Sequence, residues 1–213
     1  RRPEPDFTAS DIYFHDEVYD FDMDGMRIHS TARSPYNIYN TLSAYAALCG
    51  MGADRTHFQE MIENFDYGNN RESIFTIHGA RVQLHLAKNP IGFQQKISLV
   101  LKDPNPKDII IQINDTYQDG EDVSWLWDVD FQYLADANAA TITTNGTRQH
   151  DMGLRLKYED IPCESTTDME STIEHLTKNG TKNLYVIVNY SGLYRTNHLL
   201  TSMQDQEKGG SLS

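Results

Sequence analysis

The segment DGEDVSWLWDVDF, residues 119–131, gathers acidic side chains around two tryptophans, and carboxylates are groups that can do chemistry. The acids are Asp119, Glu121, Asp122, Asp128 and Asp130, and the tryptophans are Trp125 and Trp127. A carboxylate can orient a catalytic histidine, because the imidazole needs an acceptor on its second nitrogen to fix its tautomer. A carboxylate can equally cap a helix by accepting a hydrogen bond from a backbone N–H of the first turn.

Asp122 is the candidate for both roles. It stands two residues before Ser124, where the spacing of the apolar side chains predicts the start of a helix over about 124–137. Those apolar side chains are Trp125, Leu126, Val129 and Phe131. From spacing alone both roles remain open. Asp122 caps this helix while the tryptophans fill the core, or it is held at the helix start to orient an imidazole.

A magnesium site is a third possibility for this segment, since Mg²⁺ takes oxygen ligands such as those of Asp119, Asp122 and Asp128. No phosphate-binding glycine-rich loop stands near these acids. The eight histidines include no pair at metal-ligand spacing, and the sequence lacks the order of Ser, His and Asp that a hydrolase triad would show. We therefore predict no metal site in this chain.

Two basic residues are candidates for binding phosphate or another anion. Arg71, in GNNRES, could contact phosphate oxygens bidentately, or it forms a surface ion pair with a neighbouring acid. Lys88 and Asn89, in HLAKNP, stand at the end of a predicted strand, with Pro90 in the first turn of the next helix. Lys88 could meet an anion at that helix N-terminus, or the segment is a plain strand-to-helix turn.

Four predicted strands run into an asparagine: Asn89, Asn114, Asn145 and Asn189. Ligands of open α/β sheets bind outside the carboxyl ends of the strands, so these residues are expected to line one crevice. Asn89, Asn114 and Asn145 are accordingly candidate nucleotide- or substrate-binding residues. Asparagine is also a common turn and N-cap residue, and this structural alternative stays open. Arg148 and His150 open a predicted helix at the same edge.

The elements that would position these residues indicate an α/β domain. A hairpin joins SIFTI to ARVQLHL through His78-Gly79. After it come a helix over about 91–102, DIIIQI, the helix over about 124–137, AATITT, a helix over about 148–158, LYVIV and a last helix over about 193–203. This alternation is typical of a Rossmann-like, mostly parallel sheet with helices on both faces.

Residues 1–68 predict a separate, smaller domain. Alternating residues around Asp24-Gly25 indicate a β-hairpin, and two helices follow, one in SPYNIYNTLSAYAALCGMG and one over about 55–64. The pattern breaks at DYGNNRES, where we place the domain boundary. The second domain is predicted over 69–205, and the polar tail 206–213 is predicted to be disordered.

The composition argues against several classes of partner. The chain has 31 acids against 18 Lys and Arg, a net charge of −13, and no basic stripe, so neither nucleic acid nor an anionic membrane surface is expected. Its two cysteines, Cys49 and Cys163, form neither a zinc motif nor a disulfide framework, which fits a reducing compartment. No apolar run reaches the roughly 18–20 residues that span a bilayer.

Four segments in order closely resemble the MurT family, the ligase subunits of bacterial lipid II isoglutaminyl synthase. The segments are YNIYNTLSAYAA, HLAKNPIGFQQ, DGEDVSWLWDVDF and NGTRQHDMGLRLKY. The family's longer chain begins with an ATP-binding Mur ligase domain that contains a P-loop and a four-cysteine zinc ribbon. Neither motif occurs in this sequence, so we expect a C-terminal fragment: the end of the central ligase domain, residues 1–68, followed by the family's C-terminal domain.

The resemblance implies an ATP-dependent amidation. The α-carboxyl of D-glutamate in the lipid II stem peptide is activated as an acyl phosphate and is then attacked by ammonia to give D-isoglutamine. The ammonia comes from a partner glutaminase, GatD, in a heterodimer. The implied cofactors are ATP and Mg²⁺ in the full-length protein and zinc in its N-terminal part, with none in this fragment. The implied location is the cytoplasm, at the inner face of the membrane.

The resemblance also bears on single residues. The family's Asp before V/T-S-W, here Asp122, is thought to reach the partner's histidine and complete its triad, which favours the orienting role and is compatible with capping. Arg71 matches an Arg that Mur ligases place against nucleotide phosphates. Asn89 and Pro90 match the end of an Asp-x-Ala-x-Asn-Pro loop, although His85 replaces its acid. The fragment is thus expected to dock GatD and supply Asp122, without ligase activity of its own.

A competing hypothesis is a binding module without catalytic residues. In this alternative the asparagine-tipped loops of the Rossmann-like domain hold a nucleotide or an amino acid, and Asp122 is only a helix cap. It predicts ligand binding without any partner, whereas the first hypothesis predicts an effect of Asp122 on a glutaminase.

Overall fold

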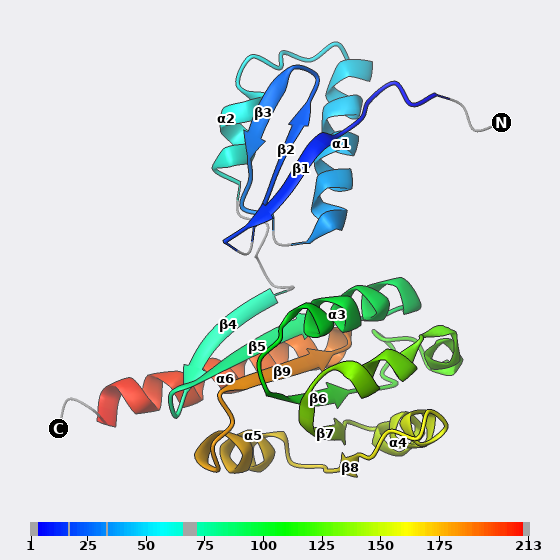
Figure 1. Cartoon of the computed structure of the whole chain (residues 1–213), viewed down its shortest axis with the longest axis vertical. Coiled ribbons are helices and arrows are strands. Elements are labelled where there is room, and N and C mark those ends of the chain that lie inside the picture. Colours follow the sequence, from blue (N-terminus) through cyan, green and yellow to red (C-terminus); the bar gives the residue numbers. More distant parts are fainter. Residues whose placement is uncertain (1–3, 17, 33, 66–71, 211–213) are drawn as a thin grey trace. The chain divides into compact units, whose positions relative to one another are not determined.

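Two units of structure follow one another along the chain, residues 1–69 (unit 1) and 70–213 (unit 2) (Figure 1). The computed structural model describes residues 4–16, 18–32, 34–65 and 72–210. Each unit has its own hydrophobic core, as expected when two stretches of chain each bury their own apolar faces.

Unit 1 is a three-stranded antiparallel sheet covered by two helices. Strands β1 (Ser10–His15), β2 (Val18–Met23) and β3 (Met26–His29) pair in chain order. Asp24 and Gly25 join β2 to β3 with φ of 46° and 77°, which is the left-handed pair that a tight hairpin turn requires. Helices α1 (Pro35–Gly50) and α2 (Phe58–Glu63) pack Tyr45 and Phe58 onto Phe21. The predicted hairpin and both predicted helices are confirmed.

Unit 2 contains a six-stranded sheet in the order β4-β5-β9-β6-β7-β8. The strands are β4 (Glu72–Ile77), β5 (Ala80–Leu86), β6 (Lys107–Gln112), β7 (Ala139–Asn145), β8 (Glu164–Ser165) and β9 (Asn183–Val188). β4 pairs antiparallel with β5 through the His78-Gly79 turn, and all other pairs are parallel. The predicted α/β class and mostly parallel sheet are therefore confirmed.

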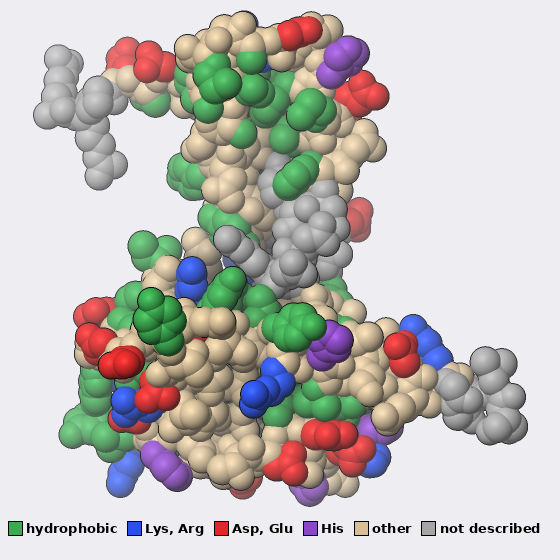
Figure 2. All heavy atoms as spheres, turned by 180° about the vertical axis from the view of Figure 1, so that it is seen from behind, with side chains coloured by type: hydrophobic (Ala, Val, Ile, Leu, Met, Phe, Trp, Pro, Cys, Tyr) green, Lys and Arg blue, Asp and Glu red, His purple; other side chains and the backbone are tan. Residues whose placement is uncertain are grey.

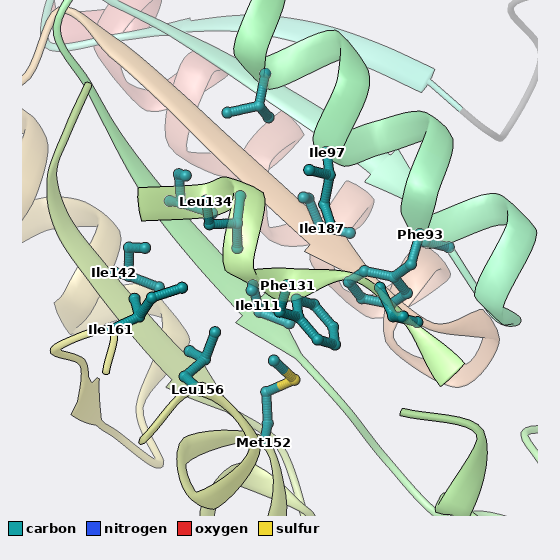
Figure 3. Packing of buried hydrophobic residues seen from close by; sticks show 14 of the residues in the cluster. Phe93, Ile97, Ile111, Phe131, Leu134, Ile142, Met152, Leu156, Ile161 and Ile187 are labelled. Carbon is teal, nitrogen blue, oxygen red and sulfur yellow. The ribbon is translucent and has the colours of Figure 1, made fainter. Parts of the chain in front are cut away.

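Helices cover both faces of this sheet. The helical elements are α3 (Pro90–Lys102), η1 (Ser124–Asp128), η2 (Phe131–Asp136), α4 (Gln149–Lys157), α5 (Met169–Lys178) and α6 (Tyr190–Gly210), where η denotes a 3₁₀ helix. α3, η1, η2 and α4 pack on Ile109 and Ile111 of β6 and Ile187 of β9. Figure 3 shows part of this cluster, including Phe93 of α3, Phe131 of η2 and Met152 of α4 beside Ile111 and Ile187. α5 and α6 pack on the opposite face, against Ile110 and Val186. This alternation follows from the two-residue period of a strand.

The single helix predicted over 124–137 is wrong, because two short 3₁₀ helices occupy this segment. Val129 lies between them in an extended conformation, with φ of −101° and ψ of 133°. This break lets Leu126, Val129 and Phe131 all reach the same core. Helix α5 and the short strand β8 were not predicted. The start signal of α5 was available, since Asp168 caps it by accepting a hydrogen bond from Ser171 N at 3.0 Å.

The predicted disordered tail is wrong for residues 206–210, which continue α6. Two side chains near the end of this helix fix it to the β4–β5 hairpin. Gln204 Oε1 accepts a hydrogen bond from Thr76 N at 2.7 Å, and Glu207 accepts one from His78 N. Met203 also packs into the core beneath the helix. Residues 211–213 lie outside the described part of the chain.

On the face drawn in Figure 2, the Lys and Arg side chains lie apart from one another among acidic and uncharged side chains. Among the described side chains seen in this view, therefore, the basic ones do not gather into a patch of the kind that binds a phosphate backbone. Within the described ranges, no helix has the length and apolar character needed to cross a membrane.

Candidate functional site

The carboxyl ends of β5, β9, β6 and β7 lie at one edge of the unit 2 sheet, because these four strands are adjacent and parallel. The asparagines predicted to line this edge follow the strands or end them. The hydrogen-bond partners of their side-chain amides differ from one asparagine to the next.

Asn114 and Asn189 join the ends of β6 and β9 through the Asn189 side chain. Its Oδ1 accepts a hydrogen bond from Asn114 N at 3.2 Å, and its Nδ2 donates to Asn114 O at 2.7 Å. The Asn114 side chain in turn accepts from Thr147 N at 3.1 Å and donates to Ser191 Oγ at 3.1 Å. Both amides thus hold neighbouring loops together.

Asn145 is buried and has the same kind of role at the end of β7. Its Oδ1 accepts a hydrogen bond from Gln112 Nε2 at 2.7 Å, and its Nδ2 donates to Thr166 O at 2.8 Å. Gly146 follows with φ of 92°, and a Cβ there would lie 2.4 Å from Ile113 O. The bonds of Asn114, Asn145 and Asn189 fit the structural alternative for these asparagines.

Asn89 caps α3, because its Oδ1 accepts a hydrogen bond from Gly92 N at 2.7 Å. Its neighbour Lys88 is exposed and places its Nζ 5.4 Å from the centre of the Tyr190 ring, a cation–π contact. The anion-binding role of Lys88 stays a prediction. Arg71 lies outside the described residues.

Two carboxylates of the loop after β6 are bound to other elements. Asp115 accepts hydrogen bonds from Thr147 Oγ1 at 2.6 Å and Arg148 Nε at 2.8 Å. The bond from Thr147 and the positive charge of Arg148 lower the pKa of Asp115. Asp119 accepts from Ser191 N at 2.8 Å, and it thereby satisfies an N–H in the first turn of α6.

Asp122 differs from these two acids, because within the described chain its hydrogen bonds go to Ser124 alone. Its Oδ1 accepts from Ser124 N at 2.8 Å, at the start of η1. Hydrogen bonds from the backbone and side chain of Ser124 lower the pKa of Asp122. This bond to the N–H two residues further on is an Asx turn that precedes η1; the N-cap residue of η1 is Val123, and no side chain caps that helix, so the predicted cap is wrong. An exposed, ionised carboxylate of fixed position is what orienting an imidazole requires.

Arg155 of α4 fastens the segment that follows Asp122, a role that the sequence analysis missed. Its Nε donates to Leu126 O at 3.2 Å and its Nη2 donates to Val129 O at 2.8 Å. The guanidinium carbon lies 5.2 Å from the centre of the Trp127 ring. The available signal was the pairing of the two unusual segments DVSWLWDVDF and RLKY in one chain.

The two tryptophans lie in different environments. Trp125 packs against Phe93 of the core, with ring centres 5.6 Å apart. Trp127 is 51% exposed and meets the ring of Tyr158, itself 69% exposed, edge to face at 5.2 Å. Large exposed rings close to one another are typical of interaction surfaces.

The residues described include no group of three or more His, Cys, Asp or Glu side chains that could hold a metal ion. Asp119 and Asp122 have the separate bonds given above.

Comparison with known proteins gives a family. The model of the family described as MurT ligase C-terminal matches residues 86–193. The lipid II isoglutaminyl synthase (glutamine-hydrolyzing) subunit MurT of Streptococcus pneumoniae is 29% identical over 187 residues, which are 86% of this chain and 42% of that protein. The protein of the same name from Staphylococcus aureus is 31% identical over 150 residues, 70% of this chain and 32% of its own. The chain thus spans less than half the length of these relatives.

Solved structures agree on the fold. A pseudomurein peptide ligase type C from Methanothermus fervidus aligns with a TM-score of 0.70 at 13% identity, over 95% of this chain and 43% of its own. The UDP-N-acetylmuramate-alanine ligase MurC from Thermotoga maritima aligns with a TM-score of 0.65 at 13% identity, over 94% of this chain and 46% of its own. The fold is that of the Mur ligases.

Proposed function

The chain belongs to the MurT ligase C-terminal family, and on that premise we propose that it is part of the ligase subunit of a lipid II isoglutaminyl synthase. In this proposal unit 1 is the end of the Mur ligase central domain and unit 2 is the C-terminal domain. The support is the family match, which lies within unit 2, together with the Mur ligase fold of the chain.

The proposed reaction is an ATP-dependent amidation of the α-carboxyl group of D-glutamate in the lipid II stem peptide. The carboxylate attacks the terminal phosphorus of ATP and displaces ADP, which leaves an acyl phosphate. Ammonia then attacks the carbonyl carbon, phosphate leaves, and an amide remains. ATP and Mg²⁺ are the proposed cofactors of the full-length protein, and zinc is the proposed metal of its N-terminal part.

We propose that unit 2 docks the glutaminase partner GatD and that Asp122 orients the histidine of its active site. That histidine would act as the base for the cysteine that attacks the side-chain amide of glutamine. The Asp122 carboxylate would accept the N–H of the second ring nitrogen, which fixes the tautomer and stabilises the imidazolium that forms.

One observation carries this role: Asp122 is exposed and bonded only to Ser124 within the described chain, while Asp115 and Asp119 are bonded to other elements. Ser124 N engages one carboxylate oxygen, Oδ1, which fixes the orientation of the group. The pKa of Asp122 is lowered by the bonds from Ser124, so the group is an acceptor at neutral pH.

The test of the proposed function is reconstitution of the full-length ligase with its glutaminase. The complex is expected to convert lipid II to the amidated product only when ATP, Mg²⁺ and glutamine are all present. Because the chain contains no P-loop motif, we expect it to hydrolyse no ATP alone. ATP hydrolysis by the isolated chain, or amidation without ATP, would contradict the proposal. The expected location is the cytoplasmic face of the membrane, where the lipid II stem would be reached.

A further inference from the structure

Arg155 is a buried cation whose guanidinium binds two backbone carbonyls in the segment after Asp122. Its side chain is 7% exposed, and one of its guanidinium N–H groups pairs with Glu159 in the turn that follows α4. The other contacts leave α4 and this turn, with Nε on Leu126 O at 3.2 Å and Nη2 on Val129 O at 2.8 Å. A guanidinium presents several donors in a rigid plane, so it can satisfy both carbonyls at once.

These two carbonyls belong to a short segment with few backbone hydrogen bonds: Leu126 O accepts from Val129 N at 3.5 Å, and Val129 O accepts from Phe131 N at 2.9 Å. η1 is a five-residue 3₁₀ helix, and the last carbonyls of a helix have no partner within it. Short helices of this size are not stable in isolation. The Trp127 and Phe131 rings lie 5.2 and 5.5 Å from the guanidinium carbon, so the cation fixes this turn through its rings as well as its carbonyls.

Asp122 is connected to the same turn by short steps. Its Oδ1 binds Ser124 N at 2.8 Å, and Leu126 N donates to Val123 O at 3.1 Å. Leu126 is also the residue whose carbonyl Arg155 holds. The position of the Asp122 carboxylate therefore depends on a turn whose far end is fixed by Arg155.

We propose that Arg155 is a positioning residue for Asp122, which acts by holding η1 in the conformation that presents the carboxylate to the partner's histidine. The inference rests on the proposed function for its consequence in hydrolysis, whereas the positioning itself concerns this chain alone. The planar fork matters more than the charge, because a lysine could not satisfy both carbonyls in the same geometry.

The first test measures the positioning without any partner. Carbon-detected NMR titration gives the pKa of Asp122 in the wild type, Arg155→Met and Arg155→Lys. Loosening of the turn weakens the bond from Ser124, so the pKa is expected to rise toward the ordinary value for Asp in both variants. Lys157→Met is the matched control, since it removes a positive charge from the same turn of α4 at an exposed position. It should leave the pKa of Asp122 unchanged.

Folding of each variant is checked by near-UV circular dichroism, and Arg155→Lys serves if Arg155→Met does not fold. An unchanged pKa of Asp122 in a folded Arg155 variant would overturn the proposal.

The second test is a double-mutant cycle on glutamine hydrolysis by the full-length pair. Arg155→Lys is expected to lower kcat roughly ten- to a hundredfold, the scale of a misplaced catalytic group, while the complex still forms. When Asp122 is already replaced by Asn, Arg155→Lys should cause no further decrease in kcat. If the two losses instead multiply, Arg155 does not act through Asp122. If Asp122→Asn alone has no effect, the proposed function fails, and the titration still decides the positioning.

Discussion

Arg155 Nη2 lies 2.8 Å from the carbonyl oxygen of Val129, and this contact joins two of the four segments that carry the family resemblance. The carbonyl belongs to DVSWLWDVDF and the guanidinium to RLKY of α4. The two segments therefore form one structural unit around η1, with Asp122 at its exposed start and Phe131 in the core.

Phe131→Ala is expected to destabilise unit 2 by about 3–5 kcal/mol, because removing a fully buried ring leaves a cavity. The ring packs against Phe93 with centres 5.5 Å apart, and no solvent reaches it. Urea unfolding followed by tryptophan fluorescence measures unit 2 selectively, since both tryptophans lie in it. Tyr133→Ala in the same 3₁₀ helix is the control, with an expected change within about 0.5 kcal/mol for an exposed side chain. Equal losses for the two variants would contradict the packing described.

Gly146→Ala should destabilise unit 2 more than Gly180→Ala does. Both glycines have positive φ, 92° and 108°, so an alanine at either position costs about 1–2 kcal/mol in backbone strain. At Gly146 the added Cβ would also lie 2.4 Å from Ile113 O, whereas at Gly180 it would meet no atom within 4 Å. The same urea titration compares the two variants. A smaller loss at Gly146 than at Gly180 would show that the strand ends do not approach so closely.

Unit 1 contains a carboxylate held by two histidines. Asp20 is buried, and its Oδ2 lies 3.0 Å from His15 Nε2 and 2.9 Å from His29 Nδ1. The hydrogen bond to Asp20, followed by that to Asp16, raises the pKa of His15 above 6.5. Burial alone would raise the pKa of Asp20, but the two histidine bonds lower it overall.

The sign of the resulting pH dependence follows from linkage. A histidine with a raised folded-state pKa stabilises the fold fully below its unfolded value of 6.5 and loses that contribution as pH rises through the folded value. Hydrogen exchange of the β2 amides should therefore accelerate as pH rises through the folded-state pKa of His15, by more than the intrinsic pH dependence of amide exchange. His15→Gln should remove most of this change, while the exposed His57→Gln should retain it. A wild-type profile that His15→Gln leaves unaltered would exclude the contribution.

Most of the fold could be predicted from periodicity, because β6 and β9 are short apolar runs and Asp24-Gly25 is a strong turn signal. The conformation of residues 124–137 could not be predicted in this way. The spacing of Leu126, Val129 and Phe131 fits one α-helix, and it fits equally well two 3₁₀ helices on either side of an extended Val129. The contact of Val129 O with Arg155, which lies 26 residues further along the chain, is one that a local pattern cannot reveal.

The sequence could predict the sheet edge at which the candidate residues lie, but not the hydrogen-bond partners of their side chains. The rule for carboxyl ends of parallel strands brought Asn89, Asn114 and Asn145 to one edge. The rule cannot tell whether an amide faces a ligand or a neighbouring loop, because that depends on the register of the adjacent strands. Asp122 was identified by its position before Ser124, and the bond between them is local enough for a sequence to reveal.

Glutamine hydrolysis by the full-length ligase with its glutaminase, wild type against Asp122→Asn, tests the central claim most directly. Asparagine is nearly isosteric but cannot stabilise an imidazolium as a carboxylate does, so kcat is expected to fall roughly 10³- to 10⁴-fold while the complex still forms. Glu121→Gln, which neutralises the exposed neighbouring acid, should hydrolyse glutamine at the wild-type rate. Hydrolysis at the wild-type rate by an intact Asp122→Asn complex would contradict the account and leave Asp122 with a local structural role in the turn before η1.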